Sequence, residues 1–281
     1  MKLTIGMSTY DDYDGVYFTI QSLRMHHPIL KEHDIEFFVL DNNPTSKYGR
    51  AVEKYIKSIK GTYMPYTEKT SSFSKYEILK HAKGDYYLGV DCHVLLSDGA
   101  MSHLIDYFKK NPNTNNIIQG PLIYDSLDHI STQWREEWSG CMYGKWHTDT
   151  DKVNIKDPYE IPMIGMGLFA CKKSNFPKIN ENFKGFGGEE WYIHQRFRMN
   201  GGKCISIPQL KWLHRFGRPS GTPYINSLND RVWNYYLGWA EIYGTPDHPK
   251  LDEIEKEFSK HIDVKQIRLI KKEALAKIFG K

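Results

Sequence analysis

An acid and an imidazole follow one apolar stretch of this chain, and both are side chains that bind metal ions. The stretch "YYLGV" leads directly into Asp91, Cys92 and His93. Residues i and i+2 of an extended strand point to the same side, so we expect Asp91 and His93 to face one target. Together they suit a divalent cation. The alternative is that Asp91 starts a turn and His93 is a half-buried loop histidine.

Two adjacent carboxylates form a second group of chemical interest. Glu189 and Glu190 follow the glycine-rich segment "KGFGG", at the expected start of a helix. Carboxylates at this position complement the positive end of the helix dipole, which is the structural alternative to a catalytic role.

A third group lies in the strand-like segment "LKWLHRFGRP", which carries His214, Arg215 and Arg218. The two guanidinium groups could bind a diphosphate through charge-assisted hydrogen bonds. The alternatives are that His214 packs between Trp212 and Phe216 and that both arginines are solvated.

Alternating strands and helices must position these groups. Strands are expected at residues 3–9, 35–41, 61–66, 85–91 and 116–124, and helices within 11–27, 49–59, 73–82 and 101–111. Continuous apolar strands separated by helices predict an α/β fold, a mostly parallel sheet with helices on both faces. Ligand sites in such sheets lie at the carboxyl ends of the strands, where Thr9, Asp41 and Asp91 fall.

The second half of the chain has a different pattern. Residues 126–160 are rich in tryptophan, tyrosine and charged residues, and we expect an irregular excursion there. Its aromatic residues serve either local packing or a platform for a sugar or a base. A strand with two close glycines is expected within 160–176. A glycine-rich loop, a helix, a Gly-Gly turn and a strand follow within 183–208.

Length and composition restrict the class of protein. The 281 residues allow one large α/β domain or one domain with an appendage, and 40% hydrophobic residues exclude a disordered chain. The net charge of +4 permits an anionic partner without requiring one.

Location is inferred from apolar runs and cysteines. The longest apolar run, "MIGMGLFAC", is too short to span a bilayer, and the N-terminus lacks the features of a signal peptide. No CxxC occurs, so the cysteines predict reduced thiols in a cytoplasmic protein; they are Cys92, Cys141, Cys171 and Cys204.

The C-terminal segment "DVKQIRLIKKEALAKIFGK" predicts a basic amphipathic helix. Its apolar residues at helical spacing are Val264, Ile267, Ile270, Ala274 and Ile278, with Lys265, Arg268, Lys271, Lys272 and Lys277 around them. Such a helix either packs on the rest of the protein with a solvated basic face, attaches to a membrane surface or contacts a nucleic-acid backbone.

Taken in order, these motifs resemble those of glycosyltransferases with the GT-A fold, over residues 1–220. "STYDD" resembles the nucleotide-binding opening of the large family-2 group, and "VLDNNPTS" resembles its "VDDGSTD" stretch. "VDCH" resembles the DxH metal motif of polypeptide GalNAc-transferases. The block "GMGLFACKKSNF…GFGGEEWYIHQRFRMNGGK" is similar to the "GGLFA…WGGE…FR…GG" block of these enzymes and of β-1,4-galactosyltransferases. "WLHRFGR" resembles the segment whose histidine completes the metal site.

The resemblance implies a catalytic domain at residues 1–220 and a helical extension at 221–281. It implies a nucleoside diphosphate sugar donor, UDP-linked by expectation, and a Mn²⁺ or Mg²⁺ cofactor that bridges the two phosphates. The implied metal ligands are Asp91, His93 and His214. The implied nucleotide-sugar contacts are Thr9, Tyr10, Asp41, Asp91, Arg215 and Arg218. For Asp41 the alternative is a turn cap, and for Asp11 and Asp12 we expect N-terminal charges of the next helix.

The "GGEE" sequence bears on stereochemistry. The retaining GalNAc-transferases carry an amide where this chain has Glu190, and inverting relatives carry a carboxylate, more often Asp. We therefore expect inversion, with Glu190 as general base and Glu189 positioning the acceptor or the sugar. The DxH motif and the "GGLFA" similarity favour retention instead.

Alternatives to an active transferase stay open at this stage. A nucleotide-sugar or carbohydrate-binding protein without turnover would keep the same fold. A nucleotidyltransferase would need a glycine-rich phosphate loop with a basic residue, which "GMSTYDDYDG" lacks. The acceptor is open among a glycan or lipid-linked glycan, a protein side chain, a small metabolite and modified DNA. The expected location is cytoplasmic or membrane-peripheral.

Overall fold

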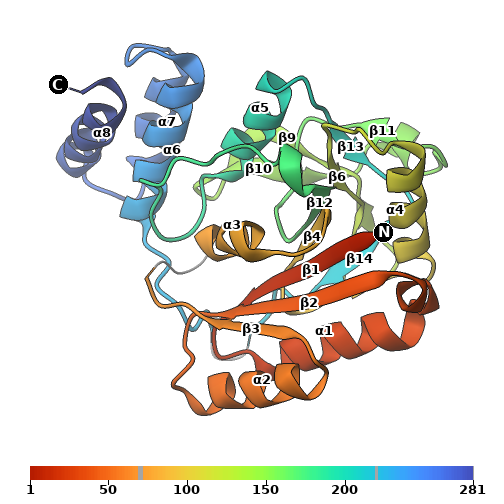
Figure 1. Ribbon diagram of the computed structural model, residues 1–281. Coiled ribbons are helices and arrows are strands. Elements are labelled where there is room, and N and C mark those ends of the chain that lie inside the picture. The colour runs from red at the N-terminus through yellow and green to blue at the C-terminus, as the bar shows by residue number, and fades with distance from the viewer. Residues whose placement is uncertain (69–71, 219–220, 281) are drawn as a thin grey trace.

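The computed structural model describes residues 1–68, 72–218 and 221–280, and a central eight-stranded sheet runs through it (Figure 1). The strand order is β11-β13-β6-β12-β4-β1-β2-β3. These strands are β1 (Lys2–Thr9), β2 (Asp34–Asp41), β3 (Thr62–Pro65), β4 (Tyr86–Val90), β6 (Ile117–Gln119), β11 (Tyr159–Glu160), β12 (Leu168–Lys172) and β13 (Cys204–Ser206). β4, β1, β2 and β3 are parallel, and β12 is antiparallel to both of its neighbours.

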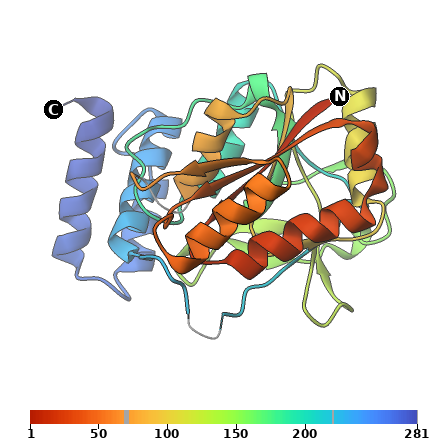
Figure 2. The same ribbon diagram turned by 60° about the horizontal axis from the view of Figure 1, so that its bottom comes forward.

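Helices cover both faces of this sheet, which confirms the expected α/β fold. They are α1 (Tyr13–His26), α2 (Lys47–Ser58), α3 (Ser72–His81), α4 (Ala100–Lys110), α5 (Glu190–Met199) and α6 (Leu228–Tyr243), with short 3-10 helices at Pro28–Glu32, Thr150–Lys152 and Lys173–Asn175. α1, α2 and α4 share one apolar core with β1, whereas α3, α5 and α6 share the other. Figure 2 shows α1 and α2 lying side by side against one face.

A second sheet, of order β5-β14-β7-β8, brings distant segments to the edge of the first. Its strands are β5 (Val94–Leu96), β7 (Leu122–Ile123), β8 (Ile130–Ser131) and β14 (Trp212–His214). The single strand expected at 116–124 is divided at Gly120, where a Cβ would lie 1.8 Å from the carbonyl oxygen of Leu210. β14 pairs with β5, so that His214 lies opposite Val94. Pro219, at the end of the predicted strand segment, lies outside the described residues.

The prediction of an irregular excursion at residues 126–160 is wrong, because a β-hairpin forms within this segment. β9 (Gln133–Ser139) pairs antiparallel with β10 (Met142–His147). Gly140 and Cys141 have φ values of 58° and 61°, the left-handed conformations that a two-residue type I′ turn requires. The expectation failed because the aromatic residues in this segment pack on the rest of the fold, which tertiary contacts decide.

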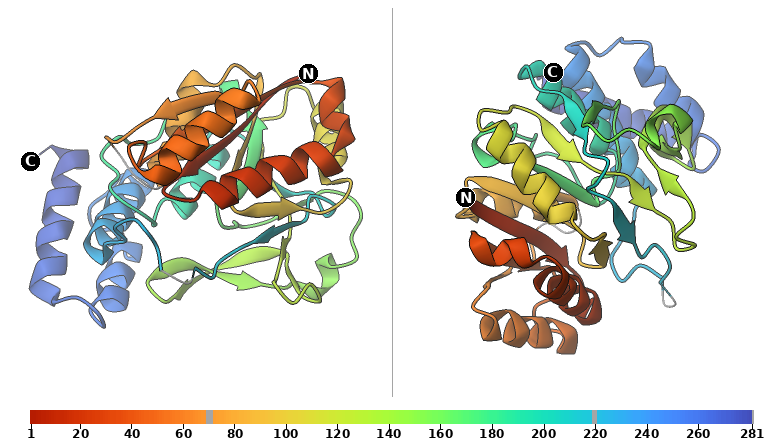
Figure 3. Two further views of the ribbon diagram at one scale, coloured as in Figure 1. Left: turned by 90° about the horizontal axis from the view of Figure 1, so that it is seen from below. Right: turned by 90° about the vertical axis from the view of Figure 1, so that its right-hand side faces the viewer.

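Three helices follow at the C-terminal end, which confirms the expected helical extension. α7 (Lys250–Phe258) and α8 (Val264–Phe279) lie outside α6, at one end of the molecule (Figures 1 and 3). α8 is amphipathic as predicted: Ile267, Ile270 and Ala274 are buried, while Arg268 pairs with Glu255 of α7. The division of the chain into domains at residue 220 stays a prediction, and it adjoins the undescribed residues 219–220.

Two further expectations concern covalent and membrane features. All four cysteines are free and buried, as reduced thiols would be. Among the described residues, no helix combines the length and the apolar character needed to cross a bilayer.

Candidate active site

The segment that carries Asp91 and His93 is a turn and not a strand, which corrects the expected geometry. β4 ends at Val90, and the chain turns through Asp91–His93 into β5. The turn is held by hydrogen bonds: Asp91 N donates to the Gly167 carbonyl at 2.8 Å, and Val94 N donates to Thr19 Oγ1 of α1 at 3.0 Å.

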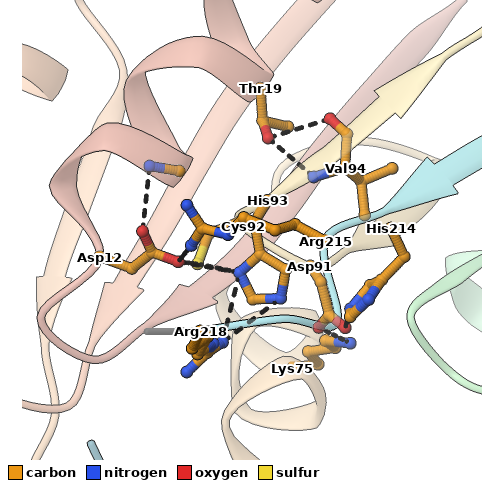
Figure 4. Close-up of polar contacts among 11 residues, drawn as sticks. Asp12, Thr19, Lys75, Asp91, Cys92, His93, Val94, His214, Arg215 and Arg218 are labelled. Carbon is orange, nitrogen blue, oxygen red and sulfur yellow. Dashed lines mark hydrogen bonds and ion pairs between the residues drawn. The ribbon is translucent and has the colours of Figure 1, made fainter. Parts of the chain in front are cut away.

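Asp91, His93 and His214 form a cluster at this turn. One ligand atom from each lies within 4.8 Å of the others. His214 Nε2 is 3.1 Å from Asp91 Oδ2, and the imidazole rings of His93 and His214 lie 4.7 Å apart (Figure 4). Side chains this close together could hold one divalent ion between them. The turn therefore brings the two residues together, as the sequence predicted for a strand.

Lys75 of α3 belongs to the same cluster, although it was not predicted from the sequence. Its ammonium lies 2.5 Å from Asp91 Oδ1 and donates to the Met166 carbonyl at 2.8 Å. Burial alone would raise the pKa of Asp91, but Lys75 and His214 together lower that pKa well below its usual range. Asp91 is therefore ionised, with Oδ2 directed toward His214. The available signal was that Lys75 precedes Ile78 by three residues, on the apolar face of its helix.

Asp12 is a second residue of the site that was not predicted from the sequence. It lies at the start of α1, as expected, and it caps the helix because Oδ1 accepts from Gly15 N at 3.1 Å. Its Oδ2 also lies 2.9 Å from His93 Nδ1 and 2.7 Å from Arg215 Nη2 (Figure 4). Burial would raise the pKa of Asp12, but the contacts with His93 and Arg215 lower it well below its usual value. An ionised Asp12 can only accept a hydrogen bond, so it favours the His93 tautomer with the proton on Nδ1, in which Nε2 can be a metal ligand.

Cys92 lies next to this pair, and Asp12, Cys92 and His93 form a second group whose ligand atoms lie within 4.8 Å of one another. Its sulfur lies 3.7 Å from Asp12 Oδ2 and 3.5 Å from His93 Nδ1. Burial raises the pKa of Cys92 far above its usual value, so its thiol is neutral when no ion is bound.

Arg218 also contacts His93. Its Nη2 is 3.3 Å from each ring nitrogen of His93, and its guanidinium lies 5.7 Å from the ring centroid of Tyr224. Tyr224 in turn meets Tyr10 edge to face at 6.4 Å. Cations and aromatic rings thus surround the approach to the metal-binding cluster.

A cavity of about 580 Å³ opens over these residues, within the size range of small-molecule sites. It brings together nearly all the predicted site residues: Thr9, Tyr10, Asp91, His93, Glu189, Glu190, His214, Arg215 and Arg218. The added residues Asp12 and Lys75 line it as well.

Asp41 is the one predicted site residue that does not line this cavity. It is fully buried at the end of β2, opposite Thr9 in the sheet. Its carboxylate accepts from Asn43 N at 2.9 Å and from the Tyr63 hydroxyl at 2.9 Å. These contacts are those of the turn-cap alternative, and a nucleoside contact by Asp41 stays a prediction.

Glu189 and Glu190 lie at the start of α5, as predicted, and both are only 6% exposed. Gly187 and Gly188, with φ values of 87° and 91°, turn the chain into the helix. Glu190 Oε2 accepts from Gly188 N at 3.1 Å. Burial raises the pKa of Glu190, although Arg231 and Lys75 oppose this shift. A buried carboxylate with a raised pKa can take up a proton near neutral pH.

Solved structures with the same architecture define the class of fold. GalNAc-T7 with UDP, GalNAc and Mn²⁺ aligns with a TM-score of 0.66 and 16% identity, over 99% of this chain and 57% of that one. The mannosyltransferase PcManGT from Pyrobaculum calidifontis, with GDP-Man and Mn²⁺, aligns with a TM-score of 0.59 and 13% identity. This alignment covers 98% of this chain and 74% of that one. TarS of S. aureus, with UDP-GlcNAc, aligns with a TM-score of 0.60 and 12% identity, over 99% of this chain and 80% of that one. The fold is that of the GT-A glycosyltransferases, as expected.

The family follows from the sequence match. Residues 4–179 match the family described as "Glycosyl transferase family 2", and because this is more than half of the chain, the protein belongs to that family. Polypeptide N-acetylgalactosaminyltransferase 5 of Caenorhabditis elegans is 26% identical over 66% of this chain and 32% of its own length. Polypeptide N-acetylgalactosaminyltransferase 10 of human and of mouse is 25% identical, over 58% of this chain and 29% of its own length. The chain therefore spans about a third of the length of the curated relatives that it matches.

Proposed function

We propose that this protein is a metal-dependent glycosyltransferase that moves a sugar from a nucleoside diphosphate sugar to an acceptor hydroxyl. The observation that carries the proposal is the convergence of Asp91, His93 and His214 in one cavity, beside Arg215 and Arg218. Membership of the family and the likeness to structures containing UDP or GDP-Man with Mn²⁺ support it. The preferred donor is a UDP-sugar, and the cofactor is Mn²⁺ or Mg²⁺.

Each group has a defined part in this proposal. A bound divalent ion neutralises charge on the leaving diphosphate, and Asp91 with the two histidines would hold it. Arg215 and Arg218 donate to phosphate oxygens. Thr9 and Tyr10, at the carboxyl end of β1, contact the nucleoside.

For the acceptor side we propose inversion, with Glu190 as the general base. Its burial and its place on the cavity wall support this role. Glu190 would take the proton of the attacking hydroxyl as the new glycosidic bond forms. Glu189 would position the acceptor or the transferred sugar.

A retaining glycosyltransferase is the second candidate. The similarity to polypeptide GalNAc-transferases favours it, since the motif resemblance associates those enzymes with retention. The anomeric configuration of the product distinguishes the two candidates.

The function is tested with the purified protein, Mn²⁺ and a panel of sugar nucleotides. We expect release of free nucleoside diphosphate, and Asp91→Asn should abolish both this release and Mn²⁺-dependent nucleotide binding. Removal of His214 by substitution with Ala should weaken metal binding less, since a neutral ligand contributes less to a dication.

The matched control is Asp98→Asn, an exposed acid seven residues further along the chain. It should behave as the unmodified protein does. Release of pyrophosphate would indicate a nucleotidyltransferase, and unchanged Mn²⁺ binding in Asp91→Asn would show that the metal assignment is wrong.

A further inference from the structure

Four aromatic side chains meet along one side of the cavity, and we call them the aromatic wall: Trp134, Trp146, Trp212 and Phe216. Trp146, at the end of β10, is central. Its ring lies 5.1 Å from Trp134, 6.4 Å from Trp212 and 6.4 Å from Phe216. Phe216 lies 4.3 Å from His214, so the wall begins next to the metal-binding cluster.

Three glycines make room for the indole rings of this wall. A Cβ on Gly144 would lie 2.1 Å from Trp134, and one on Gly165 would lie 2.9 Å from the same ring. A Cβ on Gly167 would lie 2.9 Å from Trp212. Any side chain at these positions would displace the rings, so the backbone of β10 and of the segment before β12 is shaped to hold them.

The wall has a buried base and an accessible surface. Trp134 and Trp212 are 6% and 1% exposed, whereas Phe216 is 54% exposed and Trp146 is partly exposed. An exposed phenylalanine on a cavity wall is an apolar surface that a ligand can cover. Polar side chains line the same cavity; they are Ser139, Lys145, Glu190 and Asn226.

This combination fits a pyranose ring better than it fits a lipid or a peptide. A pyranose has an apolar face of C–H groups and a rim of hydroxyls, so it can cover an aromatic ring while its hydroxyls bond to polar side chains. A lipid chain has no hydrogen-bonding groups that could pair with these polar side chains. An extended peptide is held largely by hydrogen bonds to its backbone, which the faces of aromatic rings do not supply.

We infer that Trp146 and Phe216 form an acceptor subsite that binds a pyranose sugar, and that the acceptor of this protein is a saccharide. The inference rests on the proposed function, because the donor then occupies the end of the cavity with Asp91, the histidines and the arginines. The aromatic wall is left for the acceptor. The hairpin β9–β10 is accordingly the element that selects the acceptor.

The test measures binding without turnover. With the protein saturated by UDP and Mn²⁺, linear gluco-, galacto-, manno- and chito-oligosaccharides are titrated by calorimetry. We expect one of them to bind. Phe216→Ala and Trp146→Ala should weaken that binding about tenfold, the scale of one lost aromatic contact. Trp146→Phe should restore most of it.

The matched control is Phe18→Ala, a 63% exposed phenylalanine on α1, outside the cavity lining. It should not change oligosaccharide binding, and UDP affinity should stay within about twofold in every variant. Phe216 is exposed, so its variant tests the subsite even where Trp146→Ala fails to fold.

Several results would overturn the assignment. One is that no oligosaccharide binds the unmodified protein; another is that binding is insensitive to both aromatic substitutions. If Trp146→Ala weakens the binding of a UDP-sugar but not the binding of UDP, the aromatic wall contacts the donor sugar and not the acceptor. Binding of oligosaccharide by a protein that does not bind UDP and Mn²⁺ would leave the subsite standing and refute the proposed function.

Discussion

The orientation of His93 depends on the side chains on either side of its ring. Asp12 contacts its Nδ1 from one side, while Asp91 and His214 lie on the other (Figure 4). A carboxylate behind a ligand histidine fixes the tautomer and the direction of the ring. Asp12 is therefore a positioning residue for the proposed metal site, in addition to capping α1.

We predict that Asp12→Asn weakens Mn²⁺ binding about 10–100-fold, the usual cost of losing such a partner. The amide keeps the size of the side chain but removes the charge that faces His93 and Arg215. Titration of Mn²⁺ alone, followed by electron paramagnetic resonance, measures the affinity without any turnover. Asp14→Asn, an exposed acid on the same helix, serves as the control. Equal Mn²⁺ affinity in both variants would rule out the positioning role.

Glu190 carries the prediction for the chemical step. Glu190→Gln keeps the shape and removes the basicity, so transfer should fall by about 10²–10⁴-fold with donor binding little changed. Burial raises the pKa of Glu190, and a base acts only when deprotonated. The transfer rate should therefore rise with pH through this raised pKa and fall below it.

The product distinguishes inversion from retention independently of the rate. An α-linked donor should give a β-glycoside, read from the anomeric proton coupling by NMR. An α product would identify the retaining mechanism and exclude Glu190 as this kind of base.

At the scale of elements, the site depends on the meeting of three segments. β4 ends at the turn that carries Asp91 and His93, and β14 pairs with β5 to bring His214 beside them. The segment before β12 supplies the third surface, where Gly167 accepts from Asp91 N. The position of the metal-binding cluster is thus set by strand pairing, and a small change in any of these segments should reach it.

Gly167→Ala tests this arrangement. The added Cβ would lie 2.9 Å from Trp212 and 3.1 Å from Asp91 Oδ2, so one of them must move. We expect a loss of about 1–3 kcal/mol in the free energy of unfolding, together with weaker Mn²⁺ binding. Chemical denaturation and a Mn²⁺ titration measure the two effects.

The matched control for this substitution is Gly217→Ala, whose Cβ would meet nothing within 4 Å. It should leave both quantities close to those of the unmodified protein. If Gly167→Ala did the same, the close packing of this segment against the metal-binding cluster would have no energetic weight.

At the scale of the whole molecule, the C-terminal helices extend the core beyond the sheet. Tyr235 and Trp239 of α6 are each only 1% exposed. Their rings pack against those of Trp138, Tyr143 and Trp191. α8 then packs on α6 with Ile267 fully buried. This continuity predicts that the helices and the sheet unfold together.

Ile267→Ala should lower the free energy of unfolding by about 2–5 kcal/mol, the cost of a cavity in a packed core. Leu269 of the same helix is 50% exposed, and Leu269→Ala should cost about 0.5 kcal/mol or less. Guanidinium denaturation followed by tryptophan fluorescence and by circular dichroism checks both values. Two separate transitions would show that α8 is not part of the common core.

The sequence by itself determined most helices and strands of the first 124 residues and the residue types at their ends. Apolar periodicity predicted the parallel strands, and Thr9, Asp41 and the pair Glu189–Glu190 lie at the predicted strand and helix ends. This succeeded because strand and helix formation depend on neighbours a few residues apart. Asp91 and His93 were also predicted to act together, although a turn and not a strand brings them together.

Only the tertiary structure decided which distant residues join that pair. Lys75 and Asp12 lie 16 and 81 residues before their partners Asp91 and His93, and no local pattern connects them. The hairpin β9–β10 was not predicted for a similar reason. Gly144 and Gly165 pack against the rings of Trp134 and Trp146 only in the folded chain. Contacts of this kind arise from packing between elements, and their energy depends on shape in three dimensions, which local spacing does not record.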